Sequence, residues 1–150
     1  KKLIEMVLVS VQNQSNFDLP TYATKASSGV DLKAVVNTPV TLEPLERKII
    51  YTGLKIALPE GYEAQIRPRS GLAAKYGITV LNSPGTIDAD YRGEIGVILV
   101  NLSNTSFTIQ PGDRIAQLVI SKFEQIDWLP MDELSDTKRG EGGFGSTGKK

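Results

Sequence analysis

The side chains available for chemistry are limited first by composition, because the 150-residue chain contains neither His nor Cys. Without His the chain lacks the commonest general acid–base, and without Cys it lacks a nucleophilic thiol. The usual ligands of zinc are absent as well. Any catalysis has to use carboxylates, Tyr, Lys, hydroxyl groups or a metal ion that arrives with the substrate. Lys and Arg together number 17, as do Asp and Glu, so the formal net charge is zero. This balance argues against a protein that binds nucleic acid through bulk positive charge.

A first candidate site is the segment Arg67-Pro68-Arg69-Ser70-Gly71. It directly precedes the best helix-forming run, and a helix N-terminus offers free amides and the positive end of a dipole. Arginine adds charge-assisted, forked hydrogen bonds. The segment therefore predicts an anion site, most naturally for phosphate. An ordinary helix cap with two solvated arginines is the alternative.

A second candidate segment, residues 82–94, carries Asp88 and Asp90 beside Tyr91. In an extended strand or hairpin, side chains two residues apart point to the same side. Two such carboxylates can hold a divalent cation, or one of them can act as a general base. A charged hairpin tip without a chemical role is the alternative.

A third candidate segment, residues 139–148, has five glycines in ten residues. Residues 143–149 fit most of the phosphate-loop pattern, but Lys150 stands where Ser or Thr is required and no strand precedes the segment, so we reject that interpretation. Free amides, hydroxyls, an arginine and an aromatic ring remain, and they suit a flexible lid over a phosphate chain. A disordered basic tail is the alternative.

Two further segments place one polar group each inside strand-like runs. These groups are Asp31, after Ser28-Gly29, and Gln117, after Gly112-Asp113. Taken alone, either is explained by a structural role.

The elements that must position these residues read as β-strands. Short apolar runs between Gly and Pro turns predict strands over residues 3–11, 30–36, 47–51, 62–67, 95–102 and 113–123. Residues 62–67 alternate apolar and polar side chains, whereas residues 95–100 are apolar throughout and predict burial on both faces. One short helix is predicted, with Ser70 as its cap and Gly77 as its left-handed end. The pattern favours an all-β sandwich or barrel.

The ends of the chain carry separate expectations. Residues 131–138 are acidic and aperiodic, so we expect a body of residues 1–134 and a flexible arm of residues 135–150. No apolar run approaches the ~18 residues of a membrane span, and a charge interrupts the first apolar run, so neither a membrane segment nor a secretory signal is expected. The expected location is the cytoplasm, with the nucleus or an organelle open for a eukaryotic source.

Taken together and in order, the five segments resemble the motifs of the trimeric dUTP pyrophosphatase (dUTPase) family. Each motif is a weak pattern alone, but five in this order are very specific, and they span nearly the whole chain. Ser28 stands where the family usually has Ala, and Val30 where the residue is often aromatic; neither change removes a functional group. The motifs read Ser28-Gly29-Val30-Asp31-Leu32-Lys33-Ala34, Arg67-Pro68-Arg69-Ser70-Gly71-Leu72-Ala73, Gly85-Thr86-Ile87-Asp88-Ala89-Asp90-Tyr91-Arg92-Gly93-Glu94, Gly112-Asp113-Arg114-Ile115-Ala116-Gln117-Leu118 and Arg139-Gly140-Glu141-Gly142-Gly143-Phe144-Gly145-Ser146-Thr147-Gly148.

The resemblance implies a distorted jelly-roll or β-clip barrel with one short helix, assembled as a homotrimer. Each active site then draws on three chains, with the Gly-rich arm closing over a neighbour's site. The implied reaction is hydrolysis of dUTP to dUMP and pyrophosphate, with water attacking the α-phosphorus and Mg²⁺ bridging the triphosphate. It keeps uracil out of DNA and supplies dUMP for thymidylate synthesis. Asp88 is the implied general base, while Asp31 and Gln117 either contact the cation through its waters or hold the polar network of the site.

The resemblance also implies substrate contacts. Residues 81–91, with Asn82, read the uracil edge, and Tyr91 packs under the deoxyribose, leaving no room for a 2′-hydroxyl. Arg139 suits the γ-phosphate, and Phe144 can stack on the uracil. The expected substrate-binding residues are Arg69, Ser70, Gly71, Asn82, Gly85, Thr86, Ile87, Tyr91, Gln117, Arg139, Phe144, Gly145, Ser146 and Thr147.

Two alternatives use the same fold. One is a relative of the dCTP deaminases, which the intact second, third and fifth motifs disfavour. The other is a non-catalytic nucleotide sensor or regulatory protein, which retention of Asp88 and Arg139 disfavours. Release of pyrophosphate from dUTP distinguishes both from a dUTPase.

Overall fold

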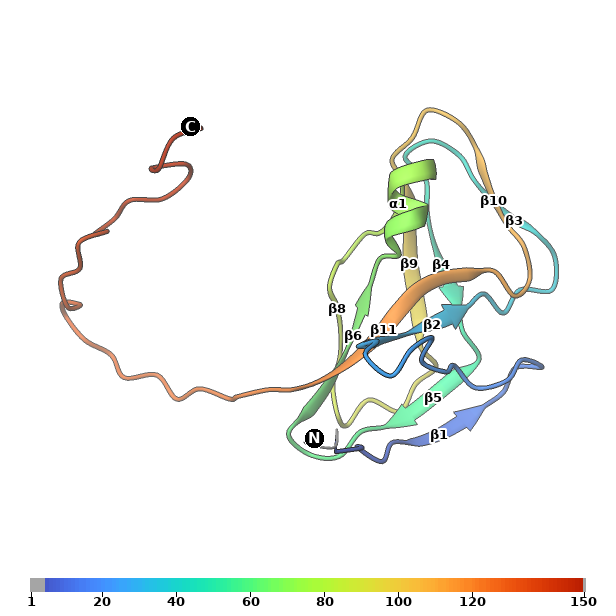
Figure 1. Ribbon diagram of the computed structural model, residues 1–150, viewed down its shortest axis with the longest axis horizontal. Coiled ribbons are helices and arrows are strands. Elements are labelled where there is room, and N and C mark those ends of the chain that lie inside the picture. Colours follow the sequence, from blue (N-terminus) through green and yellow to red (C-terminus); the bar gives the residue numbers. More distant parts are fainter. Residues whose placement is uncertain (1–4, 150) are drawn as a thin grey trace.

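Short β-strands make up most of the computed structural model, which describes residues 5–149 (Figure 1). Within that part of the chain α1 is the only helix, so the expectation of an all-β fold with one short helix is confirmed. No helix there has the length and apolar character needed to cross a membrane. The elements are β1 (Ser10–Asn13), β2 (Gly29–Lys33), β3 (Val40–Leu42), β4 (Arg47–Tyr51), β5 (Leu54–Ala57), β6 (Tyr62–Arg67), α1 (Ser70–Tyr76), β7 (Ile78–Val80), β8 (Gly85–Ile87), β9 (Gly96–Asn101), β10 (Phe107–Ile109) and β11 (Arg114–Lys122).

Two antiparallel sheets form the body of the molecule. The larger has the strand order β2-β11-β6-β8, and the smaller has the order β4-β9-β7. Two strand pairs, β1-β5 and β3-β10, extend the structure at its margins. The long strand β11 pairs with both β2 and β6 and so joins segments far apart in the sequence.

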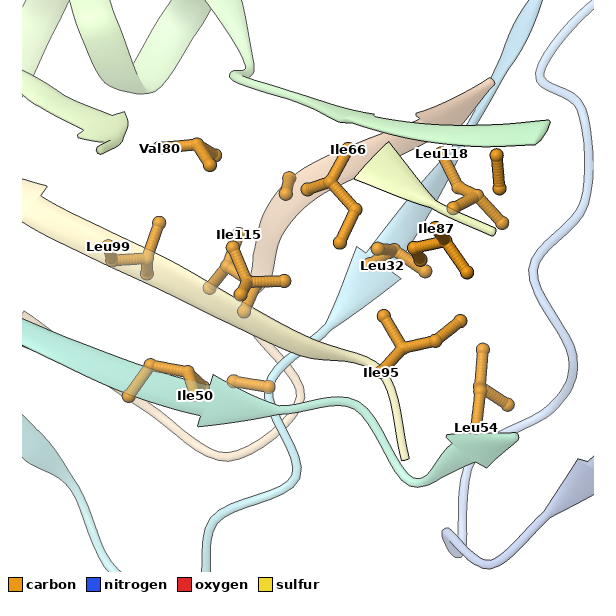
Figure 2. Close-up of a cluster of buried hydrophobic side chains, with 14 of the residues drawn as sticks. Leu32, Ile50, Leu54, Ile66, Val80, Ile87, Ile95, Leu99, Ile115 and Leu118 are labelled. Atoms are coloured by element: carbon orange, nitrogen blue, oxygen red, sulfur yellow. The ribbon is translucent and has the colours of Figure 1, made fainter. Parts of the chain in front are cut away.

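The core lies between these two sheets. Leu32, Ile66 and Leu118 point inward from the larger sheet, and Ile50 and Leu99 point inward from the smaller one (Figure 2). Leu32 in β2 and Ile66 in β6 alternate with outward polar residues, as a pleated sheet with one buried face requires. Each buried aliphatic side chain contributes about 1.5–3 kcal/mol to the free energy of folding by leaving water. The core therefore holds the strands in place, and with them the loops that join the strands.

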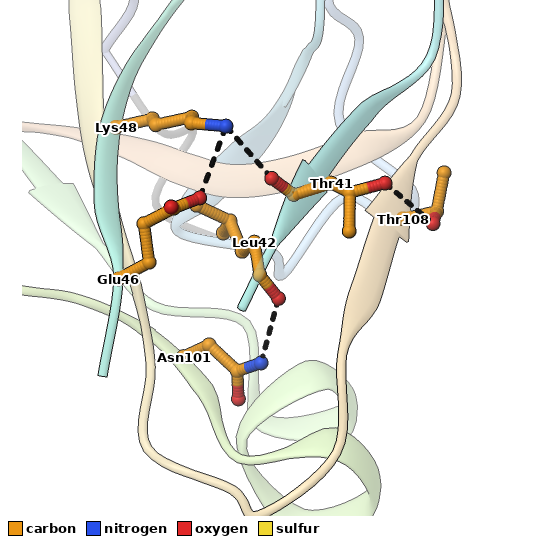
Figure 3. A network of polar contacts seen from close by, with 6 residues as sticks. All are labelled: Thr41, Leu42, Glu46, Lys48, Asn101 and Thr108. Carbon is orange, nitrogen blue, oxygen red and sulfur yellow. Dashed lines mark hydrogen bonds and ion pairs between the residues drawn. The ribbon is translucent and has the colours of Figure 1, made fainter. Parts of the chain in front are cut away.

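Buried polar groups tie the margin of the sandwich to its core. The fully buried Asn101 amide donates to the carbonyl oxygens of Leu42 (2.9 Å) and Thr105 (2.8 Å). Nearby, the ammonium of Lys48 donates to the carbonyl of Thr41 (2.8 Å) and pairs with Glu46 at 3.0 Å (Figure 3). The hydrogen bond from Lys48 lowers the pKa of the Glu46 carboxyl.

The sequence predicted the longer strands well and missed the short ones. The predictions over residues 47–51 and 62–67 coincide with β4 and β6, and those over 30–36, 95–102 and 113–123 shift by a few residues. The first prediction was wrong for residues 5–9, because the strand is Ser10–Asn13; residues 3 and 4 lie outside the described residues. The predicted strands did not include β3, β5, β7, β8 and β10, each three or four residues long. Such strands are too short to show an alternation of apolar and polar residues in the sequence. They form because they pair with neighbouring strands in the folded chain.

Burial of β9 on both faces is found only towards its end. Val97 and Leu99 face the core, and Val100 on the opposite face is also buried. Ile98, on the same face as Val100, is only half-buried. The continuous apolar run therefore overstated how far the outer face of β9 is covered within one chain.

Candidate active site

A row of polar side chains crosses the outer face of the larger sheet. Gln117 in β11 lies directly opposite Asp31 in β2 and directly opposite Arg67 in β6. Because paired residues in neighbouring strands project to the same side, all three point away from the core. The sheet thus brings together motifs that are far apart in the sequence.

A β-bulge adds Arg114 to this outer face. The register of β11 against β2 shifts between Arg114 and Ala116, so Ile115 is the extra residue. Ile115 turns into the core, with 2% of its surface exposed, while Arg114 is exposed. Strict alternation from Gln117 would have placed Ile115 outside and Arg114 inside. The role of Arg114 was missed from the sequence, because a bulge leaves no signal in the apolar pattern.

Asp31 is held between two guanidinium groups. Its carboxylate lies 3.2 Å from Nε of Arg69 and 3.9 Å from Nε of Arg114. A second nitrogen of Arg69 donates to the main-chain carbonyl of Arg114 at 2.9 Å. Asp31 and the bulge therefore fix the direction of Arg69, which precedes the helix. Arg67 does not join them, because its guanidinium bonds to Oε1 of Gln65 on its own strand (2.9 Å).

The start of α1 corrects one sequence prediction. Arg69 occupies the N-cap position in extended conformation and no side chain caps the helix, so Ser70 is the first helical residue and not its cap. The first helical hydrogen bond runs from the amide of Ala73 to the carbonyl of Arg69. The amides of Ser70, Gly71 and the next residue consequently have no partner within the helix. The predicted C-terminal end is confirmed, since Gly77 is left-handed with φ of 66°.

Gln117 lies close against β2 because that strand begins with glycine. Its Nε2 donates to the carbonyl of Pro68 at 3.0 Å. A Cβ on Gly29 would be only 2.6 Å from Oε1 of Gln117. The Ser28-Gly29 segment thus makes room for the amide side chain that reaches the loop before α1.

A pocket of about 190 Å³ lies at the β8 edge of the sandwich. Ile66 and Ile95 contribute apolar walls, and Gly96 lies at the start of β9. All six residues expected in the substrate-binding hairpin line this pocket: Asn82, Gly85, Thr86, Ile87, Asp88 and Tyr91. Gly85 and Ile87 are buried by pairing with β6, whereas the polar members are exposed. Packing of β8 therefore anchors the polar groups around a small, partly apolar hollow.

Asp88 and Asp90 do not form the pair that was expected from an extended segment. The chain turns directly after β8, and the amide of Tyr91 donates to the carbonyl of Asp88 at 3.1 Å. Asp88 lines the pocket and Asp90 does not. Among the described residues, no three His, Cys, Asp or Glu side chains gather as metal ligands would. The prediction of a shared cation site on these two carboxylates rested on extended backbone, which ends at Ile87.

Tyr91 is placed by its own turn. Its hydroxyl donates to the carbonyl of Glu94 at 3.1 Å, and its side chain remains partly exposed along the pocket. The guanidinium of Arg92 donates to the carbonyl of Ala89 at 2.6 Å and closes the turn. The aromatic ring is thereby presented at the pocket by a loop of few residues.

The arm residues are not brought to either part of the site. After β11 the chain leaves the body and extends into solvent (Figure 1). Arg139 bonds within the arm, from Nε to the carbonyl of Gly142 at 2.7 Å, and Phe144 is fully exposed. Gly145, Ser146 and Thr147 are exposed as well.

The two assembled parts of the site lie at opposite edges of one sheet. Asp31 and Gln117 belong to β2 and β11, and they face outward. The pocket lies at the β8 edge, and its apolar wall includes the core-facing side chains of Ile66 and Ile87. From β2 to β8 is three interstrand spacings, about 14 Å. A ligand in the pocket of one chain is therefore remote from Asp31 of that chain.

Comparison with known proteins gives the family of this chain. A family model described as dUTPase matches residues 15–148. The deoxyuridine 5′-triphosphate nucleotidohydrolase of Cytophaga hutchinsonii is 61% identical over 141 residues, covering 94% of this chain and 92% of the relative. The protein of the same name from Fusobacterium nucleatum is 54% identical and covers 97% of this chain and 100% of the relative.

A solved structure agrees with these relatives. The dUTPase of Staphylococcus bacteriophage 80alpha, solved with dUPNHPP, superimposes with a TM-score of 0.83 at 29% identity, covering 94% of this chain and 98% of the phage protein. The match runs through the body and the motif-bearing segments alike, since the family model reaches into the arm. The chain belongs to the dUTPase family, the hydrolases of deoxyuridine 5′-triphosphate.

Proposed function

We propose that the protein hydrolyses dUTP to dUMP and pyrophosphate, with Asp88 as the general base. A water molecule forms a bond from its oxygen to the α-phosphorus, the bond to the bridging oxygen of the β-phosphate breaks, and pyrophosphate leaves. Asp88 takes the proton of the water. The observation that carries this proposal is the gathering of all six expected hairpin residues, Asp88 included, around one pocket. With no His or Cys in the chain, a carboxylate is the natural base.

The pocket suits a pyrimidine nucleoside. Main-chain groups near Gly85 and Ile87, with the amide of Asn82, pair with the uracil edge in this proposal. The ring of Tyr91 packs under the deoxyribose and excludes a 2′-hydroxyl. The pocket is small and has polar groups at its rim, which supports recognition of one nucleoside rather than of apolar ligands. A wrong base would cover the polar groups of the pocket without pairing them, which costs much more than a lost apolar contact.

In this proposal, the triphosphate of a nucleotide in the pocket of one chain meets the groups around Arg69 of a neighbouring chain. Arg69 and the free amides of Ser70 and Gly71 offer positive charge and hydrogen-bond donors, and Gln117 adds an amide. These groups stabilise the negative charge that develops during in-line displacement. Asp31 contributes mainly by holding Arg69 in place, because both of its oxygens face guanidinium groups.

The donors near Asp31 fit a magnesium ion held chiefly by the substrate. They comprise one carboxylate and the amide oxygen of Gln117, and Mg²⁺ commonly keeps several waters and binds through few protein groups plus phosphates. Asp31, paired with arginines at 3.2 and 3.9 Å, suits contact through those waters better than direct ligation. When bound, the ion neutralises charge on the triphosphate.

The protein works as a homotrimer in this proposal, with each site shared between chains. The separation of about 14 Å between Asp31 on β2 and the pocket at the β8 edge of the same sheet supports a site completed by a neighbour. The arm of residues 135–150 then closes over a neighbour's site, where Phe144 stacks on uracil and Arg139 binds the γ-phosphate. Gly145, Ser146 and Thr147 add donors around the phosphates. Full exposure of Phe144 in the single chain supports a function away from its own body.

We place this activity in the cytoplasm, where it keeps uracil out of DNA and supplies dUMP for thymidylate synthesis. The boundary between the body of residues 1–134 and the arm is part of the proposal. The last strand ends at Lys122, so residues 124–134 form an exposed connection between the two.

The decisive experiment measures pyrophosphate release from dUTP, UTP, dCTP and dTTP with magnesium present, using Asp88→Asn as the matched inactive control. We expect release from dUTP far above the other nucleotides. Binding of dUTP without release would favour a nucleotide sensor, and ammonia from dCTP would favour a deaminase. Mass measurement of the native protein tests the trimer independently.

A further inference from the structure

Gly93 lies directly under the ring of Tyr91. A Cβ built on Gly93 would be 2.3 Å from the tyrosine hydroxyl oxygen, 2.5 Å from Cζ and 2.9 Å from Cε2. These distances are shorter than any ordinary contact of a Cβ atom. Because several atoms of a rigid ring are involved, no bend at the tip of the side chain removes the collision; the whole ring has to move.

The backbone at Gly93 does not itself require glycine. Its φ lies outside the left-handed region in which Gly77 and Gly112, for example, are found. Alanine is therefore permitted there by the main chain. The space taken by Tyr91 is the one observed reason for glycine at this position.

The turn around Tyr91 cannot easily yield to an added side chain. The Tyr91 hydroxyl donates to the carbonyl of Glu94 at 3.1 Å, on the far side of Gly93. The guanidinium of Arg92 donates to the carbonyls of Ala89 (2.6 Å) and Tyr91 (3.1 Å). With the backbone of the turn held in this way, the collision falls on the ring, which lines the pocket.

We infer that Gly93 is a specificity-determining position that acts through Tyr91. By lacking a Cβ, it lets the ring lie against the turn at the place where the ring excludes a 2′-hydroxyl. The inference rests on the proposed function, in which Tyr91 packs under the deoxyribose. Gly93 is a positioning residue, because Tyr91 lines the pocket and Gly93 does not.

The test compares kcat/KM for dUTP and UTP in Gly93→Ala, Tyr91→Ala and the double variant. Gly93→Ala is expected to lower the dUTP/UTP selectivity by about tenfold, as a lost steric contact does. Tyr91→Ala is expected to lower it to a similar extent, and the double variant should match Tyr91→Ala, because without the ring there is nothing left to collide. Tyr91→Phe keeps the ring and loses only the hydrogen bond to Glu94, so its loss of selectivity should be clearly smaller than that of Tyr91→Ala.

Three results would overturn the inference: unchanged selectivity in Gly93→Ala, losses that multiply in the double variant, or a loss in Tyr91→Phe as large as in Tyr91→Ala. If Gly93→Ala does not fold, the inference requires that the double variant folds with the Tm of Tyr91→Ala, and failure of both overturns it. Binding of α,β-imido analogues of dUTP and UTP gives the same selectivity without turnover. A wild-type protein that releases no pyrophosphate therefore refutes the proposed function and still leaves this inference open to test.

Discussion

The hairpin pocket and the arm both carry motif residues, yet they are held in opposite ways. In the pocket, Ile87 is buried by the pairing of β8 with β6, and Asp88 follows it directly. In the arm, the guanidinium of Arg139 bonds only to Gly142, well beyond Lys122 at the end of the last strand, and Phe144 is fully exposed. The core of the same chain positions the pocket residues, whereas no packing against that core holds the arm residues in place.

In the proposed function, this contrast separates two kinds of contribution to one active site. Groups anchored on buried strands are held in a fixed geometry before substrate binds, which suits a general base and a base-recognition pocket. Groups on an exposed segment become ordered only on closing, which suits the exclusion of water and the final grip on phosphates. Changes in the pocket should therefore alter chemistry or stability, and changes in the arm should alter activity alone.

The largest effect is expected from Asp88→Asn. The substitution keeps the shape of the side chain but removes the base, so kcat should fall by roughly two to four orders of magnitude. Binding of a non-hydrolysable dUTP analogue, measured by calorimetry, should be largely intact. A variant that keeps more than a tenth of wild-type turnover would exclude Asp88 as the base and make Asp90 the next candidate.

Truncation after Ser135 should leave a folded, trimeric and nearly inactive protein. The strands of the core all end by Lys122, so Tm should change little, while lost positioning and entry of water should lower kcat/KM by about a hundredfold or more. Steady-state kinetics and thermal melting measure the two effects. Full activity in the truncated protein would contradict the lid role.

Mixed trimers test whether the arm serves a neighbour. An intact arm from an Asp88→Asn chain can close over a site whose Asp88 comes from a truncated chain, so trimers of the two variants should regain activity. The mixing is verified by mass measurement. Activity no higher than that of either parent, in trimers known to be mixed, argues against an exchanged arm.

Ile87→Ala and Phe144→Ala form a pair that contrasts body and arm directly. Removing the buried Ile87 side chain should lower the free energy of unfolding by about 2–5 kcal/mol. Removing the exposed Phe144 ring should leave that free energy unchanged while reducing affinity for dUTP. Denaturant unfolding and analogue binding on both variants check this. A stability loss in Phe144→Ala would show that the arm packs on the body after all.

Tyr91→Ala should have a smaller, selective effect. In the proposed function the ring excludes one hydroxyl by contact, so discrimination against UTP should fall by about tenfold while dUTP affinity changes less. The ratio of kcat/KM for the two nucleotides is the measurement. Unchanged selectivity would remove Tyr91 from sugar recognition.

The smallest effect is expected far from both regions, at Glu46. Its pKa is lowered in the folded protein by the hydrogen bond from Lys48, so its contribution to stability is present above the pKa of the unfolded chain and disappears as the pH falls through the folded value. The Tm of Glu46→Gln should lie slightly below that of the wild type at neutral pH and converge with it in acid. Because Glu46 neither lines the pocket nor contacts Asp31 and its arginines, activity should not change. A constant difference across the pH range would assign the effect to something other than this ion pair.

Much of the body could be predicted from the sequence, where the physical signal is local. β4 and β6 were predicted to the residue because apolar side chains and turn residues mark their ends. The left-handed end of α1 at Gly77 was predicted for the same reason: one residue type meets the local need. The order of the five motifs was enough to indicate the family, because residue types and their order can be read from the sequence without knowledge of the fold.

The contacts that orient the site were decided by tertiary structure alone. The bulge that turns Arg114 outward depends on pairing with β2, eighty residues earlier in the chain. The expected cap at Ser70 gave way to Arg69 because Asp31 and the carbonyl of Arg114 hold that arginine in place. Asp88 lines the pocket and Asp90 does not, because the chain turns directly after β8.

The sequence by itself thus determined which chemical groups the protein has and the strands that bear most of them. It did not determine which of these groups come into contact. Those contacts depend on the register of β11 against β2, on the bulge at Ile115 and on the space that Gly93 leaves for Tyr91. These are properties of packing, where a shift of one residue moves a side chain to the other face of a sheet.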